Sequence, residues 1–172
     1  MEATKEQIKR LRVDALYGKK KHFNAADRKA SLNNWLTIPV ALINAILSTV
    51  LVSNFQEIDP NLFKWVAASI SLVATVLSTL AVLMKFAKKV EGHRRVGNKY
   101  LAIMKRCERI LAYDKDGLAD QASIIKMFEE TSSTIEEVNR EASSFSTSKK
   151  DYYDAQASIK NGDEDYLPQE LN

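Results

Sequence analysis

The sequence has 172 residues, of which 45% are hydrophobic and 27% are charged, and its net charge is +3. This length excludes a TIM barrel and a two-domain enzyme with a full nucleotide-binding half. The single cysteine, Cys107, excludes a disulfide scaffold and a structural zinc site built on cysteine. Five glycines and three prolines are too few for an all-β chain full of tight turns.

The charge is strongly segregated along the chain although its total is small. Residues 1–34 carry a net charge of +5, residues 35–84 of −1, residues 85–115 of +7 and residues 116–172 of −8. The average therefore hides two basic regions that flank a nearly uncharged one, followed by an acidic C-terminal region.

Residues 1–34 are predicted to form a cytoplasmic amphipathic helix and a basic juxtamembrane segment. Apolar residues recur at helical spacing between Thr4 and Tyr17, and Gly18 is expected to interrupt that helix. A basic run from Lys19 to Lys21 follows, and we expect the next residue, His22, to be solvated.

Two uncharged segments come next, and each is long enough to cross a membrane. No charged residue lies among the 27 residues between Lys29 and Glu57, or among the 20 residues between Lys64 and Lys85. About 20 apolar residues span the hydrocarbon core of a bilayer. Buried core helices of a soluble bundle are the alternative, but such helices should show a polar face. We expect transmembrane helices over residues 35–55 and 63–86, joined by a short external loop over residues 56–62.

The flanks of both segments agree with a membrane hairpin. Tryptophan side chains favour the headgroup level, and lysine and arginine favour the cytoplasmic side. The pattern predicts a multi-pass protein of the bacterial inner membrane with both termini in the cytoplasm. Asp59 and Pro60 are expected to start the second helix. The predicted interface anchors are Trp35, Trp65, Lys85, Lys88, Lys89, Arg94 and Arg95.

Small and polar residues form one line along each predicted span. Close helix packing in lipid uses such residues, and a pore lined by several hairpins would use the same ones. The carboxamide of Asn44 must meet another helix or water, because an unpaired amide in hydrocarbon is costly. The residues predicted to line a pore or to pack the helices are Thr37, Asn44, Ser48, Ser71, Thr75 and Ser78.

Residues 87–145 are predicted to form cytoplasmic helices. The first of these helices is either continuous with the second span or hinged at Gly92 and Gly97. Apolar residues recur every three or four positions, which predicts a small bundle that assembles through Tyr100, Ile103, Cys107, Ile125, Phe128 and Ile135. Residues 146–172 are expected to be a mostly disordered acidic tail with a short helix near residues 151–159. The predicted fold class is all-α.

No feature of the sequence indicates an enzyme or a cofactor. The two histidines, His22 and His93, lie in basic runs, where solvation is the usual role, and Cys107 is expected in the core rather than as a nucleophile. Metal-ligand spacing and phosphate-binding loops are absent from the sequence. The basic runs could bind nucleic acid, but their position favours lipid headgroups instead.

The order of these features, with the stretch EGHRRVGNKYLAIMKRCERIL after the second span, resembles the SLATT family. The residues that carry the resemblance are His93, Arg94, Gly97, Tyr100, Leu101 and the stretch from Cys107 to Arg109. This family comprises two-span effectors associated with bacterial nucleotide-second-messenger and related antiviral defence systems.

The resemblance implies a membrane effector of an abortive-infection type of antiphage defence system. Such an effector is expected to form a homo-oligomer that opens a pore or disrupts the inner membrane. A fused nucleotide-binding sensor is not evident in the sequence, so we expect a separate sensor or trigger protein. The alternative is a non-conducting membrane anchor or scaffold whose cytoplasmic helices recruit a soluble partner.

Overall fold

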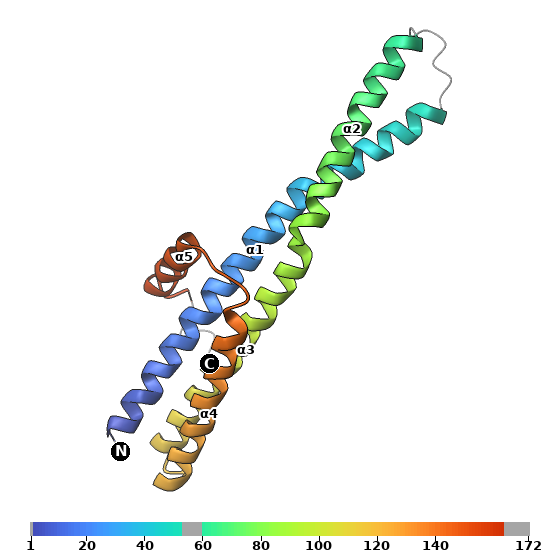
Figure 1. The fold of residues 1–172 in the computed structure, drawn as a ribbon. Helices are drawn as coiled ribbons and strands as arrows, with labels where there is room; N and C mark the ends of the chain where they lie inside the picture. The colour runs from blue at the N-terminus through green and yellow to red at the C-terminus, as the bar shows by residue number, and fades with distance from the viewer. Residues whose placement is uncertain (1, 53–59, 164–172) are drawn as a thin grey trace. The chain divides into compact units, whose positions relative to one another are not determined.

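The computed structural model describes residues 2–52 and 60–163, and the side chains of residues 50–61 and 63 also lie outside the description. All regular structure in the described ranges is helical, which confirms the all-α prediction. The helices, in chain order, are α1 (Glu2–Val52), α2 (Pro60–Met84), α3 (Phe86–Lys115), α4 (Gln121–Ala142) and α5 (Lys149–Lys160) (Figure 1).

The chain divides into two compact units. The first, which we call the bundle, contains Met1–Asp27 and Val90–Asn172, and the second, which we call the hairpin, contains Arg28–Lys89. Helix α1 contributes its first half to the bundle and its second half to the hairpin, whereas α2 lies wholly in the hairpin.

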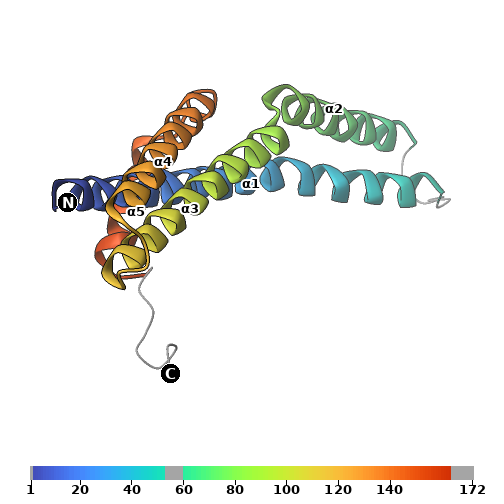
Figure 2. The same cartoon turned by 90° about the horizontal axis from the view of Figure 1, so that it is seen from below.

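The bundle packs α1, α3 and α4 side by side around one apolar core (Figures 1 and 2). Lys5 pairs with Asp114 at 2.7 Å and Arg12 with Glu108 at 2.9 Å, so α1 and α3 are antiparallel. The core contains the apolar stripe predicted on α3, and its buried members are Ile8, Ala15, Leu16, Val96, Tyr100, Ile103, Met104, Cys107, Ile110, Ile124, Ile135 and Val138.

The predicted interruption at Gly18 is wrong, because α1 continues through this residue. A Cβ atom at Gly18 would lie only 2.7 Å from Cδ1 of Tyr100. The glycine is therefore required by the close approach of α1 to the Tyr100 ring on α3, and it does not end the helix.

The break between the second span and the cytoplasmic helix lies at Lys85 and not at Gly92 or Gly97. Lys85 has a φ of 50°, the left-handed region, and it separates α2 from α3. Gly92 and Gly97 are helical and accommodate aromatic rings instead. A Cβ at Gly92 would lie 2.0 Å from Phe145, and one at Gly97 would lie 3.3 Å from Phe23.

The register of α4 differs from the prediction by one residue at its start. Asp120 caps the helix by accepting a hydrogen bond from the Ser123 backbone N–H at 2.9 Å. Ile124 is fully buried, whereas the predicted Ile125 is 40% exposed. Apolar spacing of three and four residues allows either Ile124 or Ile125 to face the core. Packing of α4 in the bundle determines that Ile124 does. Ile135 is buried and Phe128 packs against the core, as predicted.

Part of the predicted tail is an ordered helix. Helix α5 begins at a capping box in which Ser148 and Asp151 exchange hydrogen bonds, and Asp151 and Ala155 are buried. The short helix expected near residues 151–159 is confirmed, and it extends over Lys149–Lys160. The remaining acidic residues from 164 onward lie outside the described residues, as does the predicted cap Asp59.

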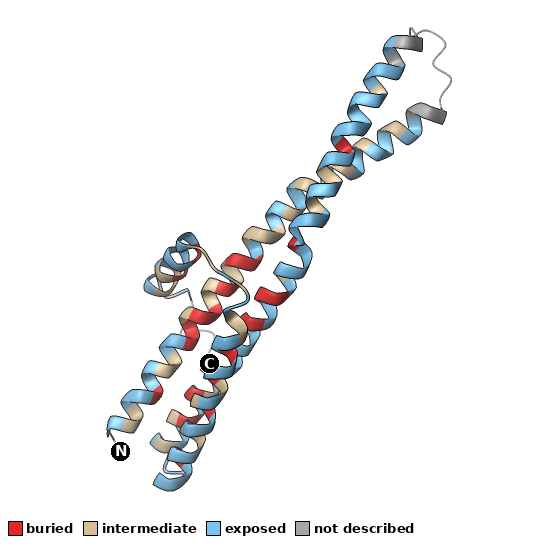
Figure 3. Ribbon diagram, viewed as in Figure 1, coloured by how far each residue is buried: buried red, intermediate tan, exposed pale blue. Residues whose placement is uncertain are grey.

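Few of the described side chains of the hairpin are buried, in contrast with the bundle (Figure 3). Two helices of the described chain are long and apolar enough to cross a membrane. The apolar windows that qualify them are 0% and 6% buried. A core helix of a soluble protein would be mostly buried, so these exposed apolar surfaces favour lipid as their surroundings.

Candidate functional site

A polar recess in the hairpin contains most of the polar residues predicted from the two spans. Its volume is about 400 Å³, and it is lined by Asn44, Ser71, Ala74, Thr75, Ser78 and Thr79. The structure thus brings Asn44 of α1 together with Ser71, Thr75 and Ser78 of α2. Thr37 and Ser48 do not line this recess. Thr79 was not predicted as a site residue, although it follows Thr75 by one helical turn.

Three hydroxyl groups of this recess, those of Thr75, Ser78 and Thr79, donate to carbonyl oxygens of their own helix. Thr75 donates to the carbonyl oxygen of Ser71, and Ser78 donates to that of Ala74, each at 2.8 Å. Ser48 and Thr37 make the same contact, to the carbonyl oxygens of Asn44 and Asn33. The hydroxyl groups that make this contact can lie in hydrocarbon with their donors paired, while their oxygens remain able to accept further hydrogen bonds.

Asn44 differs from its neighbours in the recess. Its side chain is exposed, and it makes no hydrogen bond to any described residue of the chain. A serine or threonine can bond to its own helix, but the two donors and two acceptor sites of a carboxamide need partners elsewhere. Within a bilayer, those partners are water or another helix.

The predicted interface anchors fall into two groups. Trp35 and Trp65 are 77% and 75% exposed, and Lys85, Lys88 and Lys89 are exposed as well, as anchors must be. Arg94 and Arg95 belong to the bundle, and although both are exposed, each also forms an ion pair there. Arg94 lies 3.6 Å from Asp27, and Arg95 donates to Glu141 at 2.7 Å.

The two histidines are buried against each other, which overturns the expectation that they are solvated. His22 and His93 are 2% and 1% exposed, and their Nδ1 atoms are 3.1 Å apart. Burial, followed by the nearby charges of His93 and Lys21, lowers the pKa of His22 from 6.5 to about 4. Their position in basic runs gave no indication of this pairing, because the contact joins residues 71 positions apart.

Cys107 lies in the core of the bundle, as predicted. It is fully buried, and burial raises the pKa of its thiol from 9.0 to about 11. A thiol of this kind is a poor nucleophile at neutral pH. Among the described residues, no cluster of three or more His, Cys, Asp or Glu could hold a metal ion.

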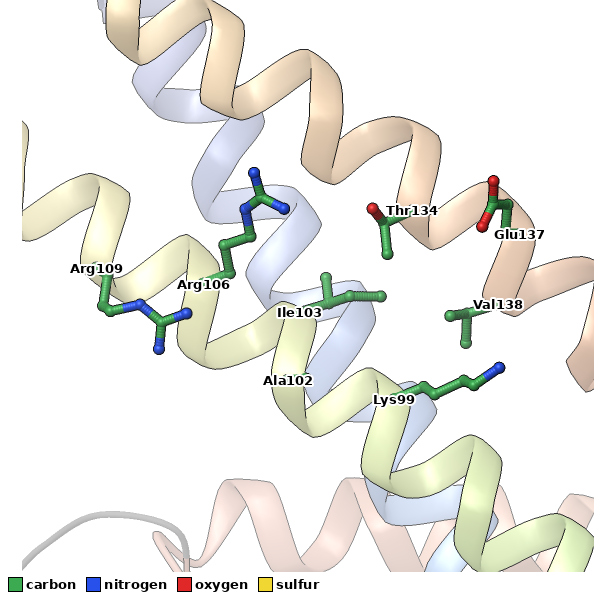
Figure 4. A pocket seen from close by; sticks show the side chains of 8 residues that line it. All are labelled: Lys99, Ala102, Ile103, Arg106, Arg109, Thr134, Glu137 and Val138. Carbon is green, nitrogen blue, oxygen red and sulfur yellow. The ribbon is translucent and has the colours of Figure 1, made fainter.

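A groove of about 380 Å³ lies between α3 and α4 (Figure 4). Ile103, Thr134 and Val138 lie between the two helices, Lys99, Arg106 and Arg109 project from α3, and Glu137 projects from α4. Arg106 pairs with Glu130 at the edge of α4, and Lys99 pairs with Glu141. Of the predicted assembly residues, Ile103 lines this groove.

An exposed apolar hairpin joined to a packed helical bundle defines a two-span membrane protein. The comparison with known families agrees, because residues 4–170 match the SMODS and SLOG-associating 2TM effector domain family 4. The chain therefore belongs to this SLATT family of two-transmembrane effector domains, and this membership indicates a membrane effector of defence systems. No curated protein and no solved structure matches the chain.

Proposed function

We propose that this protein is an inner-membrane effector of antiphage defence that assembles into a homo-oligomer and opens a pore when a separate sensor activates it. Both termini and the bundle are cytoplasmic in this proposal. The observation that carries it is the exposed, unpaired carboxamide of Asn44 at the polar recess of an otherwise apolar hairpin.

The cost of an unpaired amide supports assembly. Burying an amide in hydrocarbon without a partner costs several kcal/mol, so the isolated hairpin is unfavourable in a bilayer. A second copy can supply a hydrogen-bond partner, and water in a lumen can do the same. Each cross-helix hydrogen bond in a membrane contributes about 0.6–2 kcal/mol. This free energy changes the association constant of two subunits about threefold to thirtyfold.

The recess also supports a water-accessible path. It combines one amide with four hydroxyl groups whose oxygens can still accept hydrogen bonds, and such groups line polar pores. One hairpin cannot enclose a conduit, so several copies must contribute this face. The bundle would hold the resting arrangement, and the sensor would favour a second arrangement by binding it more tightly.

Substitution of Asn44 tests the proposal. We expect Asn44→Leu to reduce the mean number of subunits counted by single-molecule photobleaching, and to prevent loss of membrane potential in cells that carry the activating system. Asn34→Leu is the matched control, because this exposed amide precedes Trp35 and can be hydrated. If Asn44→Leu assembles with the same number of subunits as the wild type and still depolarises the membrane fully, the proposal is refuted.

The groove between α3 and α4 favours a second candidate function, a non-conducting anchor that recruits a soluble partner. Its apolar floor and charged edges can accept a helix of another protein. An intact membrane potential in activated, expressing cells, with the partner retained at the membrane, would favour the anchor over the pore.

A further inference from the structure

Three exposed lysines lie close together where the hairpin ends. They are Lys85, Lys88 and Lys89, which we call the lysine turn. The backbone N–H of Lys89 donates to the carbonyl oxygen of Lys85 at 3.1 Å, so the three residues lie within one helical turn. Like charges at this spacing repel one another. The lysine turn is therefore favoured by a negative charge nearby.

The hairpin has no carboxylate that could supply this negative charge within its described residues. Residues 28–52 and 60–89 contain neither Asp nor Glu. Basic residues of the bundle do have acidic partners, as Lys5 has in Asp114 and Arg95 has in Glu141. In the part of the chain that the structure describes, no member of the lysine turn forms an ion pair. Its counter-charge must therefore come from another molecule.

The polar recess fixes the depth of the lysine turn in a bilayer. Thr75 of α2 lines the recess. Trp65 precedes Thr75 by ten residues and Lys85 follows it by ten, so each lies about 15 Å from Thr75 along the helix. Together these distances equal the thickness of the hydrocarbon core, which is about 30 Å. With the recess at the midplane, Trp65 and Lys85 lie at opposite boundaries of the core.

Trp35 lies at the same boundary as the lysine turn. It precedes Asn44, the recess residue of α1, by nine residues, or about 14 Å of helix. Helices α1 and α2 run in opposite directions, because the short segment from Val52 to Pro60 joins them. Trp35 is 77% exposed, and indole rings favour the headgroup level. The lysine turn therefore lies where the phosphate groups of lipids are.

We propose that the lysine turn binds the phosphate groups of acidic phospholipids and selects these lipids over zwitterionic ones. A zwitterionic headgroup carries a cationic amine beside its phosphate, whereas an acidic headgroup has a net negative charge. Each lysine near an acidic membrane surface strengthens binding about fivefold. This inference goes beyond the proposed function, since it requires neither a pore nor a particular orientation of the hairpin in the membrane.

The two tryptophans of the sequence allow the lipids at the two boundaries to be measured separately. Trp65→Phe leaves Trp35 beside the lysine turn, and Trp35→Phe leaves Trp65 at the other boundary. The full-length variants are placed in vesicles of equal parts phosphatidylglycerol and phosphatidylcholine, with brominated chains on one lipid at a time. Bromine quenches a neighbouring indole, so the ratio of the two quenching values gives the local lipid ratio.

We expect phosphatidylglycerol to be favoured about fivefold at Trp35. At Trp65 we expect little preference, because Lys64 is followed by no other lysine there and the sequence places Glu57 and Asp59 nearby. Equal quenching of Trp35 by the two lipids would overturn the proposal.

Charge variants test whether the lysines cause the preference. The preference at Trp35 should fall to the value at Trp65 in a triple variant with Lys85→Gln, Lys88→Gln and Lys89→Gln. The matched control removes three exposed lysines of the bundle and should keep the preference, through Lys105→Gln, Lys115→Gln and Lys126→Gln. A preference that survives in the first variant, or is lost in the control, would overturn the proposal.

The wild-type lysine turn provides a test that does not depend on folding of the variants. In about 1 M salt the Debye length is about 3 Å, so the preference at Trp35 should fall toward equality. A preference that is unchanged by salt would overturn the proposal. Inorganic phosphate and a short double-stranded DNA offer the same phosphate chemistry in solution. If either abolishes the preference at constant ionic strength, the ligand is a soluble phosphate and the lipid assignment is wrong.

Discussion

The close contact between Gly18 and Tyr100 gives a quantitative test of the bundle. In Gly18→Ala, the new methyl group would lie 2.7–2.8 Å from three atoms of the Tyr100 ring, so the ring or the helix must move. The ring cannot move freely, because it is 4% exposed and its hydroxyl donates to Asn139 at 2.6 Å.

The expected loss of stability follows from opposing effects. Overpacking of a core costs about 1–3 kcal/mol, and loss of the Tyr100 hydrogen bond costs about 1 kcal/mol more. Alanine is favoured over glycine in a helix by about 1 kcal/mol. The net destabilisation of the bundle is therefore about 1–3 kcal/mol.

Gly97→Ala is the matched control for the Gly18 substitution. Its methyl group would lie 3.3 Å from the far edge of the half-buried Phe23 ring, which can shift slightly. The gain in helix propensity then dominates, and the bundle should be unchanged or up to about 1 kcal/mol more stable.

Labelling of Cys107 measures this difference directly. It is the one cysteine of the sequence and is fully buried in the bundle, so a thiol reagent reaches it only when the bundle opens. When opening is a rapid pre-equilibrium, the labelling rate is proportional to the population of the open state. We expect the rate to rise about 5-fold to 150-fold in Gly18→Ala and to stay level or fall in Gly97→Ala. Equal rates in the two variants would refute the packing argument.

Two further predictions use the same labelling measurement. Ile124→Ala should destabilise the bundle by about 2–4 kcal/mol, whereas Ile125→Ala should change it by less than about 0.5 kcal/mol, and equal losses would contradict the register of α4. Tyr100→Phe should destabilise the bundle by about 1 kcal/mol and raise the labelling rate about fivefold. The loss is small because Asn139 is exposed and water can replace the missing hydroxyl. An unchanged labelling rate would show that this hydrogen bond contributes nothing to stability.

Much of the architecture was predictable because lipid and water impose strong constraints on sequence. Two long uncharged segments predicted the exposed apolar helices of the hairpin. The apolar stripe on α3 predicted the buried positions of Tyr100, Ile103 and Cys107, since helical periodicity alone defines which side chains share a face. The polar recess was partly predictable for the same reason, because Ser71, Thr75 and Ser78 lie on one side of α2.

Other features depend on contacts between distant parts of the chain, which periodicity does not contain. Glycine disfavours a helix, so the sequence suggested a break at Gly18. Only the close approach of the Tyr100 ring shows why the helix needs a glycine there. Ile124 and Ile125 are equally hydrophobic, and the choice between them is made by what α4 packs against.

By itself, the sequence determined the class of protein, because the local order of apolar and charged residues predicts membrane spans and amphipathic helices. The tertiary structure alone decided the environment of the histidines. His22 and His93 lie in basic runs that suggest solvation, yet antiparallel packing of α1 on α3 brings them together and removes them from water. Burial depends on which distant helices meet, and that is the physical reason that composition could not predict it.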